Sequence, residues 1–196
     1  MTEGDYMKLL VIDSCIRGEL SSTRRLLNRF LEKFGGEYDV TRLVLTELGL
    51  NPMDAAELKH RNDLLSEGRT DDGMFKYAHL IKEADKIIVA APYWDFSFPS
   101  LLKVFFEKTA VTGITFGYTE NGSVGYCKAD HLVYLSTAGG YIAGAHLGAE
   151  YVRNLVGMFG INNVSSYSIE GLDIDPSKRE QLLEEGITRI LSAAKL

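Results

Sequence analysis

Residues 86–99 read Lys-Ile-Ile-Val-Ala-Ala-Pro-Tyr-Trp-Asp-Phe-Ser-Phe-Pro, and they are the strongest indication of the fold. The apolar run from Ile87 to Ala91 is typical of a strand that is buried on both faces of a parallel sheet. Pro99 suits the first turn of a helix predicted over 99–110, because proline has no backbone N–H to leave unpaired there. A strand followed directly by a helix is the repeating unit of α/β folds.

The same alternation of strands and helices continues along the chain. Further strands are predicted over 9–12, 40–45, 131–136 and 161–169, helices over 22–34, 147–159 and from 176 onward, two helical stretches over 54–84, and a loop or hairpin over 111–127. Five strands interleaved with helices predict a parallel sheet that is covered on both faces. Since no linker or repeat interrupts the pattern, we expect a single domain over residues 1–196, a length that allows a proper core.

Composition narrows the function classes. The formal net charge is −6 and no basic face is clustered, which argues against nucleic-acid binding. No apolar run approaches the ~20 residues that cross a bilayer, and the start of the chain has no signal-peptide pattern. Cys15 and Cys127 are too few for a disulfide framework, and His60, His79 and His131 have no companions at ligand spacing. We therefore expect a reduced, cytoplasmic protein with no membrane segment and no metal site.

Three loops at the carboxyl ends of the predicted strands have unusual compositions, and ligands of open parallel sheets bind at this edge. Loop 13–23 ends in Ser21, Ser22 and Thr23 at a helix start, where free N–H groups favour an anion such as a monophosphate. An ordinary helix cap is the alternative interpretation. Loop 91–98 carries four aromatic side chains, which form either a flat stacking wall or a plug under the next helix.

The third loop, 136–148, begins with a pair of glycines at 139 and 140. Glycines let a backbone approach a flat ligand closely, although an ordinary turn also explains the pair. A phosphate cradle, an aromatic wall and a glycine pair together predict a flat heterocycle with a single phosphate tail. The chain lacks G-x-x-x-x-G-K-[ST] and G-x-G-x-x-G, which argues against a nucleotide triphosphatase and a dinucleotide-binding Rossmann site.

In this order the loops resemble those of the FMN-dependent NADH azoreductases and their NAD(P)H:quinone oxidoreductase relatives. The similarity rests on the hydroxyl-rich first loop, on Ala-Pro-Tyr-Trp-Asp-Phe at 91–96, on Ser-Thr-Ala-Gly-Gly at 136–140, and on Gly-Ile-Thr-Phe-Gly-Tyr-Thr-Glu-Asn-Gly at 113–122. It implies a flavodoxin-like three-layer sandwich with sheet order 2-1-3-4-5. It also implies a homodimer with two FMN sites at the dimer interface.

The resemblance also implies which residues bind FMN. They are Cys15, Ser21, Ser22 and Thr23 for the phosphate, Pro92, Tyr93, Trp94, Asp95 and Phe96 along the ring and ribityl chain, and Thr137, Ala138, Gly139 and Gly140 at the pyrimidine end. Tyr118 and Met158 would close the substrate pocket from the partner subunit. Cys15, Asp95 and Ala138 depart from a serine, an asparagine and an arginine found in the family. An Asp95 carboxylate that faces the flavin would lower its reduction potential.

The implied reaction is a two-electron ping-pong transfer from NADH or NADPH, through the flavin N5, to a quinone or an azo compound. Because the cofactor carries this chemistry, we assign no catalytic side chain. Tyr141 and His146 are candidates for a proton relay, although a surface or interface role is favoured for both. Two alternatives stay open: a flavodoxin-type electron carrier with a protein partner, and an FMN-free regulatory or interaction domain on the same fold.

Overall fold

The structure is a computed structural model that describes residues 6–196. Its main sheet consists of β1 (Met7–Asp13), β2 (Tyr38–Val44), β3 (Lys86–Ala90), β6 (His131–Thr137) and β7 (Val164–Ile169). The strands lie in the order β2-β1-β3-β6-β7, and every neighbouring pair is parallel. The predicted parallel sheet and its 2-1-3-4-5 order are confirmed. Strand order reverses beside β1 and β3, which places the expected ligand site at their carboxyl ends.

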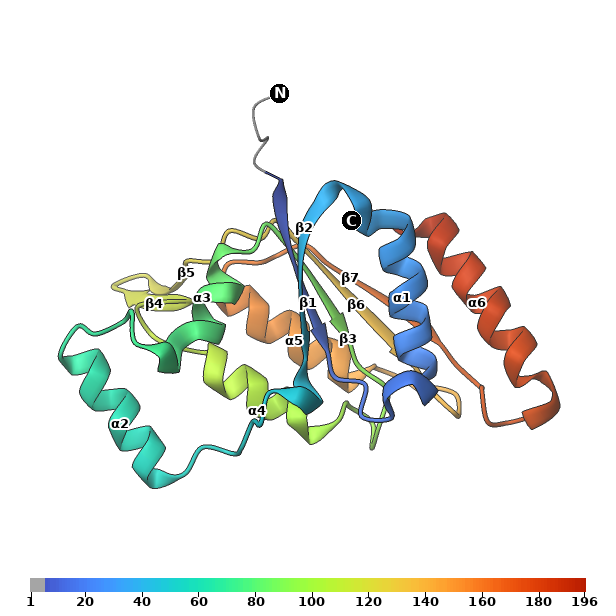
Figure 1. Cartoon of the computed structure of the whole chain (residues 1–196), viewed down its shortest axis with the longest axis horizontal. Helices are drawn as coiled ribbons and strands as arrows, with labels where there is room; N and C mark the ends of the chain where they lie inside the picture. Colours follow the sequence, from blue (N-terminus) through green and yellow to red (C-terminus); the bar gives the residue numbers. More distant parts are fainter. Residues whose placement is uncertain (1–5) are drawn as a thin grey trace.

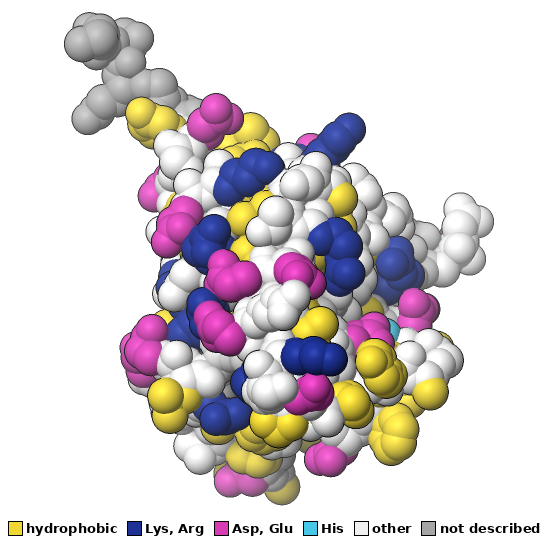
Figure 2. All heavy atoms as spheres, turned by 90° about the vertical axis from the view of Figure 1, so that its right-hand side faces the viewer, with side chains coloured by type: hydrophobic (Ala, Val, Ile, Leu, Met, Phe, Trp, Pro, Cys, Tyr) yellow, Lys and Arg dark blue, Asp and Glu magenta, His cyan; other side chains and the backbone are white. Residues whose placement is uncertain are grey.

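Helices cover both faces of this sheet (Figure 1). One face carries α1 (Ser22–Phe34) and α6 (Arg179–Ala193), and the other carries α3 (Lys76–Glu83), α4 (Ser100–Thr109) and α5 (Leu147–Met158). A further helix, α2 (Ala55–Ser66), stands apart from the sheet and buries only Leu64. On the side of α6, basic and acidic side chains alternate over the surface without a large patch of one sign (Figure 2).

The two faces have separate hydrophobic cores because side chains alternate along each strand. In β1, Leu9 and Val11 pack toward α1 and α6, whereas Leu10 and Ile12 pack toward α3 and α4. All four side chains are buried, as the unbroken apolar run predicts. Burial on both faces gives the strand ends a rigid support, and the loops at the carboxyl edge are built on that support.

The segment predicted as a loop or hairpin is a hairpin of β4 (Phe116–Thr119) and β5 (Gly122–Gly125). It is tied to the end of α5, since the Cys127 N–H donates to the Phe159 carbonyl at 3.1 Å. Short 3-10 turns complete the chain at Gly18–Leu20, Gly35–Glu37, Leu45–Glu47, Gly73–Phe75 and Pro176–Lys178.

Several boundaries differ by a few residues from those predicted, and three of the differences concern the last strand, the C-terminal helix and Pro99. The last strand begins at Val164, because the Ile161 N–H is used to close the end of α5 on the Val156 carbonyl at 2.9 Å. The C-terminal helix begins at Arg179 after the 3-10 turn that Pro176 starts. Pro99 is the cap residue before α4 and does not lie in its first turn. Among residues 6–196, no helix has both the length and the apolar character needed to cross a membrane.

Candidate functional site

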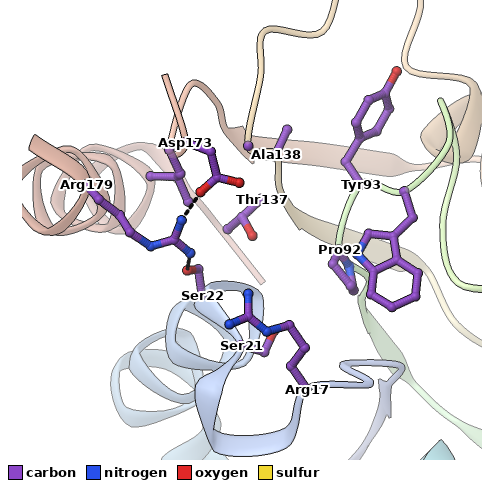
Figure 3. A pocket seen from close by; sticks show the side chains of 12 residues that line it. Arg17, Ser21, Ser22, Pro92, Tyr93, Thr137, Ala138, Asp173 and Arg179 are labelled. Atoms are coloured by element: carbon purple, nitrogen blue, oxygen red, sulfur yellow. Dashed lines mark hydrogen bonds and ion pairs between the residues drawn. The ribbon is translucent and has the colours of Figure 1, made fainter. Parts of the chain in front are cut away.

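A cavity of about 180 Å³ opens at the carboxyl edge of the sheet, beside the point where strand order reverses. Its walls are formed by Arg17, Ser21, Ser22, Pro92, Tyr93, Trp94, Thr137, Ala138, Gly139, Leu172, Asp173 and Arg179 (Figure 3). The three loops that the sequence indicated therefore meet at one place. A fourth segment, the loop after β7 with the start of α6, joins them.

The first wall is the start of α1. Ser21 is its cap residue, and its side-chain oxygen accepts a hydrogen bond from the Arg24 N–H at 3.3 Å. The first turn contains no acidic side chain, and Asp173, the acidic residue in the cavity wall, is paired with Arg179. Because the first N–H groups of a helix have no partner within it, this end offers backbone donors beside the hydroxyls of Ser21 and Ser22.

Two of the residues expected at the phosphate have other partners. The Thr23 and Thr137 hydroxyls are hydrogen-bonded to each other at 2.7 Å and are buried, which fastens the start of α1 to the end of β6. Cys15 is fully buried behind the cavity wall, with Sγ 3.9 Å from the Ala90 carbonyl oxygen. Burial also raises the pKa of the Cys15 thiol, which stays neutral. This placement gives no support to Cys15 as a phosphate donor.

An ion cluster lies beneath the same loop. Asp13 is fully buried, and its Oδ2 is 2.9 Å from Arg24 Nε and 2.7 Å from Arg42 Nη2. Its Oδ1 accepts a hydrogen bond from the Cys15 N–H at 3.0 Å. Burial alone would raise the pKa of Asp13, but the hydrogen bonds from Arg42 and Cys15 and the charge of Arg24 together lower it. Asp13 is therefore ionised, and it holds the loop from below.

The aromatic loop turns back on itself at its tip. Trp94 and Ser97 exchange two backbone hydrogen bonds, at 3.2 and 2.7 Å. Asp95 and Phe96 between them have φ of 49° and 64°, the left-handed values of a type I′ turn. Such values are costly for side chains other than glycine and are found preferentially at functional sites.

The turn divides the residues of this loop into three groups. Tyr93 and Trp94 line the cavity, whereas Asp95 and Phe96 are exposed at the tip and do not line it. Phe98 is the plug under the following helix, since its ring packs edge-on against Phe106 and Tyr151. Trp94 is 41% exposed beside the cavity. The aromatic wall is thus narrower than the sequence predicted.

The glycine loop is held against the loop that follows β7. The Leu172 and Asp173 N–H groups donate to the carbonyls of Ala138 and Gly139 at 3.2 and 2.8 Å. A Cβ on Gly139 would lie 2.2 Å from Asp173 Oδ2, so a larger residue at this position would push the Asp173 side chain aside. Gly140 does not line the cavity, and its carbonyl accepts the Gly171 N–H at 3.0 Å.

The loop after β7 and the start of α6 add Leu172, Asp173 and Arg179 to the site. The sequence analysis identified none of these three residues. Arg179 Nη2 donates to Ser22 Oγ at 3.0 Å, and Nη1 forms an ion pair with Asp173. Figure 3 shows the Arg179 side chain reaching from α6 toward the start of α1, with Arg17 on the opposite side. These residues could have been found from the rule that ligands bind at the carboxyl edge of an open parallel sheet, because the last strand also ends at this edge.

The two relay candidates lie outside the cavity wall. Tyr141 is 74% exposed. His146 caps α5 by accepting the Ala149 N–H on Nδ1 at 3.2 Å, and its ring meets those of Tyr93 and Tyr134 edge-on. Burial lowers the pKa of His146, so its imidazole is neutral near pH 7. His146 thus supports Tyr93 from behind.

Tyr118 and Met158, which were expected to act from a partner subunit, lie away from this cavity in their own chain. Tyr118 is 71% exposed on β4, and Met158 ends α5 and packs against the core. Within residues 6–196, no three His, Cys, Asp or Glu side chains gather in a way that could hold a metal ion.

Comparison with known proteins adds to this geometry. A family model described as "Flavodoxin-like fold" matches residues 7–193. An "FMN-dependent NADH:quinone oxidoreductase" of Clostridium perfringens is 34% identical over 196 residues, which cover 96% of this chain and 98% of the relative. An "FMN-dependent NADH:quinone oxidoreductase 2" of Clostridium acetobutylicum is 32% identical, with the same coverage of 96% and 98%.

Solved structures agree on the fold. An azoreductase from Bacillus anthracis str. Sterne has a TM-score of 0.79 and 24% identity, covering 95% of this chain and 97% of that one. An FMN-dependent NADH-azoreductase from Bacillus anthracis str. Ames Ancestor, in complex with FMN, has a TM-score of 0.77 and 19% identity, covering 95% and 98%. At these identities the likeness shows a shared fold.

Proposed function

The chain belongs to the flavodoxin-like family of the FMN-dependent NADH:quinone oxidoreductases, as its motifs indicated, and on this premise we propose that it is an enzyme that reduces quinones or azo compounds with NADH or NADPH. The main support for this proposal is the composition of the cavity. The start of α1 without acidic side chains, the hydroxyls of Ser21 and Ser22, the aromatic wall and Gly139 all lie at one edge of the sheet. Bound FMN would supply the two-electron chemistry of a ping-pong reaction, and the protein supplies binding and orientation.

The donors of the cavity fit FMN. Ser21 and Ser22, with the first N–H groups of α1, would hold the phosphate. Tyr93 and Trp94, with Pro92, would line the ring and the ribityl chain. Thr137, Ala138 and Gly139 would border the pyrimidine end, where the glycine allows close approach of the backbone.

The exposed rim of the cavity supports a homodimer. Trp94 lines the cavity and is 41% exposed, so a flat ring stacked beside it would have one side open to solvent in a single chain. We propose that a second copy of the chain covers this rim and brings Tyr118 and Met158 to the substrate pocket.

A visible spectrum of the purified protein, with and without added FMN, tests the proposal first. We expect a yellow protein that NADH or NADPH bleaches without oxygen and that menadione reoxidises. Absence of flavin binding at micromolar FMN would contradict the proposed function and favour an FMN-free domain. A yellow monomer that neither NADH nor NADPH reduces would favour a flavodoxin-type electron carrier.

Two broader expectations stay predictions. One domain over the whole chain is supported by the unbroken five-strand sheet and by the family match over residues 7–193. A cytoplasmic location is in keeping with Cys15 and Cys127, which are both free thiols. Limited proteolysis and cell fractionation would check these two predictions.

A further inference from the structure

We propose that Arg179, at the start of the C-terminal helix, recognises the FMN phosphate and makes the protein select FMN over riboflavin. This inference rests on the proposed function, since it concerns the same flavin site. It differs from the phosphate contacts that the motifs implied, because those lie in the loop before α1. Arg179 lies 157 residues further along the chain than Ser22, its hydrogen-bond partner.

The geometry leaves Arg179 free to bind an anion. Its Nη2 donates to Ser22 Oγ at 3.0 Å, and its Nη1 pairs with Asp173. A guanidinium has five N–H donors in a planar fork, so donors remain after these two contacts. The side chain is 35% exposed and lines the cavity at Ser22 (Figure 3). A phosphate at the start of α1 would lie within reach of the fork.

The fold does not need Arg179 as a brace. The loop before it is already fastened by the backbone hydrogen bonds from Leu172 and Asp173 to the glycine loop. Helix α6 is fastened to α1 by Arg25, which pairs with Glu180 and Glu184, and by Arg29, which also pairs with Glu184. The loop after β7 and helix α6 are therefore held in place without Arg179. Its contact with Ser22 can be replaced by a contact with a ligand.

Charge within the cavity favours a phosphate. Arg17 and Arg179 line it together with Asp173, which gives the lining a net charge of +1 in a chain whose formal net charge is −6. A phosphate monoester carries about −1.5 to −2 charges at neutral pH. Arginine binds phosphate through paired, charge-assisted hydrogen bonds, whereas the uncharged ribityl end of riboflavin offers no such acceptor.

The test compares two flavins that differ only in the phosphate. Dissociation constants for FMN and riboflavin would be measured by flavin fluorescence on flavin-free full-length protein, for the wild type, Arg179→Gln, Arg179→Lys and Arg189→Gln. Arg189 is the matched control, because it lies in the same helix α6 but is exposed and does not line the cavity.

We expect Arg179→Gln to weaken FMN binding about tenfold or more, as loss of a charge-assisted hydrogen bond predicts, and to leave riboflavin within about twofold. Arg179→Lys should recover part of the FMN preference, because it keeps the charge without the fork. Arg189→Gln should change neither constant. Rising salt should weaken FMN binding by the wild type more than by Arg179→Gln.

Equal weakening of both flavins in Arg179→Gln would overturn the inference, because it would mark a structural role. An unchanged FMN constant in that variant would overturn it as well. If Arg179→Gln does not fold, an Arg179→Lys protein that binds both flavins as the wild type does would also overturn it. Wild-type protein that binds neither flavin would contradict the proposed function itself, whereas wild-type binding of FMN and riboflavin with equal affinity would overturn only the inference.

Discussion

Asp13 is the residue on which the loop beneath the cavity depends. It is fully buried, it forms ion pairs with Arg24 and Arg42, and it accepts a hydrogen bond from the Cys15 N–H. Breaking a buried ion cluster by removing one partner is far more destabilising than losing a surface ion pair, since the other charges stay buried. The loop after β1 is therefore expected to be sensitive to loss of the Asp13 charge.

Asp13→Asn is therefore expected to lower the free energy of unfolding by about 3 kcal/mol at pH 7. The pKa of Asp13 is lowered in the fold, so its stabilising effect is full above the pKa of an unfolded aspartate, about 3.9, and is lost as pH falls through the lower folded value. Urea unfolding between pH 7 and pH 3 should show the difference from wild type shrinking below about pH 4. The exposed Asp39→Asn serves as control, and a difference that persists at low pH would disprove the assignment.

Asp95 is the second residue with a testable charge. It lies at the exposed tip of the type I′ turn, next to Trp94, which lines the cavity. Removing a negative charge near a flavin favours the electron-rich reduced form, so Asp95→Asn should raise the reduction potential of bound FMN. Solvent around the exposed tip should keep the rise small. Equilibration with redox dyes measures it, with the exposed Asp39→Asn of β2 as control, and an unchanged potential would contradict an effect of the Asp95 charge on the flavin.

At the scale of elements, the β4–β5 hairpin is positioned by a backbone-to-backbone contact. A Cβ on Gly125 would lie 2.0 Å from Gly160 N and from the Phe159 carbonyl carbon. Backbone atoms on two fastened segments cannot move aside as the end of a side chain can. The hairpin that carries Tyr118 can therefore lie this close to the end of α5 only because residue 125 has no side chain.

Gly125→Ala should consequently lower the free energy of unfolding by about 3 kcal/mol, the upper end of overpacking costs. Gly157→Ala is the matched control, because nothing lies within 4 Å of its added Cβ and it sits inside α5. There alanine should stabilise the helix by about 0.5–1 kcal/mol. Thermal unfolding of the two variants measures both effects, and similar melting temperatures would refute the role of the contact.

At the scale of the whole molecule, the open cavity predicts that flavin binding and dimerisation are coupled. If a partner covers the rim beside Trp94, diluting the protein below its dimer dissociation constant should weaken FMN binding, and added FMN should favour the dimer by the same factor. Light scattering gives the mass, and fluorescence titrations at several protein concentrations give the coupling. An FMN affinity that is independent of protein concentration across the monomer–dimer transition would exclude it.

Much of the fold was predictable because it is written in local patterns. Buried strands such as Lys86–Ala90 appear as unbroken apolar runs, and the start of α1 appears as hydroxyl residues before a helical repeat. Three of the four segments that line the cavity were found in this way. The fourth, 172–179, has no distinctive composition, and it reaches the cavity only because backbone hydrogen bonds fasten it to the glycine loop.

The parallel α/β architecture, the family and the edge of the sheet where the candidate site lies can be inferred from the sequence, because periodicity, loop composition and motif order are properties of neighbouring residues. Which side chains face the cavity depends on tertiary contacts. Cys15 turned into the core, the tip with Asp95 and Phe96 turned away, and Arg179 came in from the last helix. These outcomes depend on strand register, turn conformation and contacts between distant segments, which no local pattern contains.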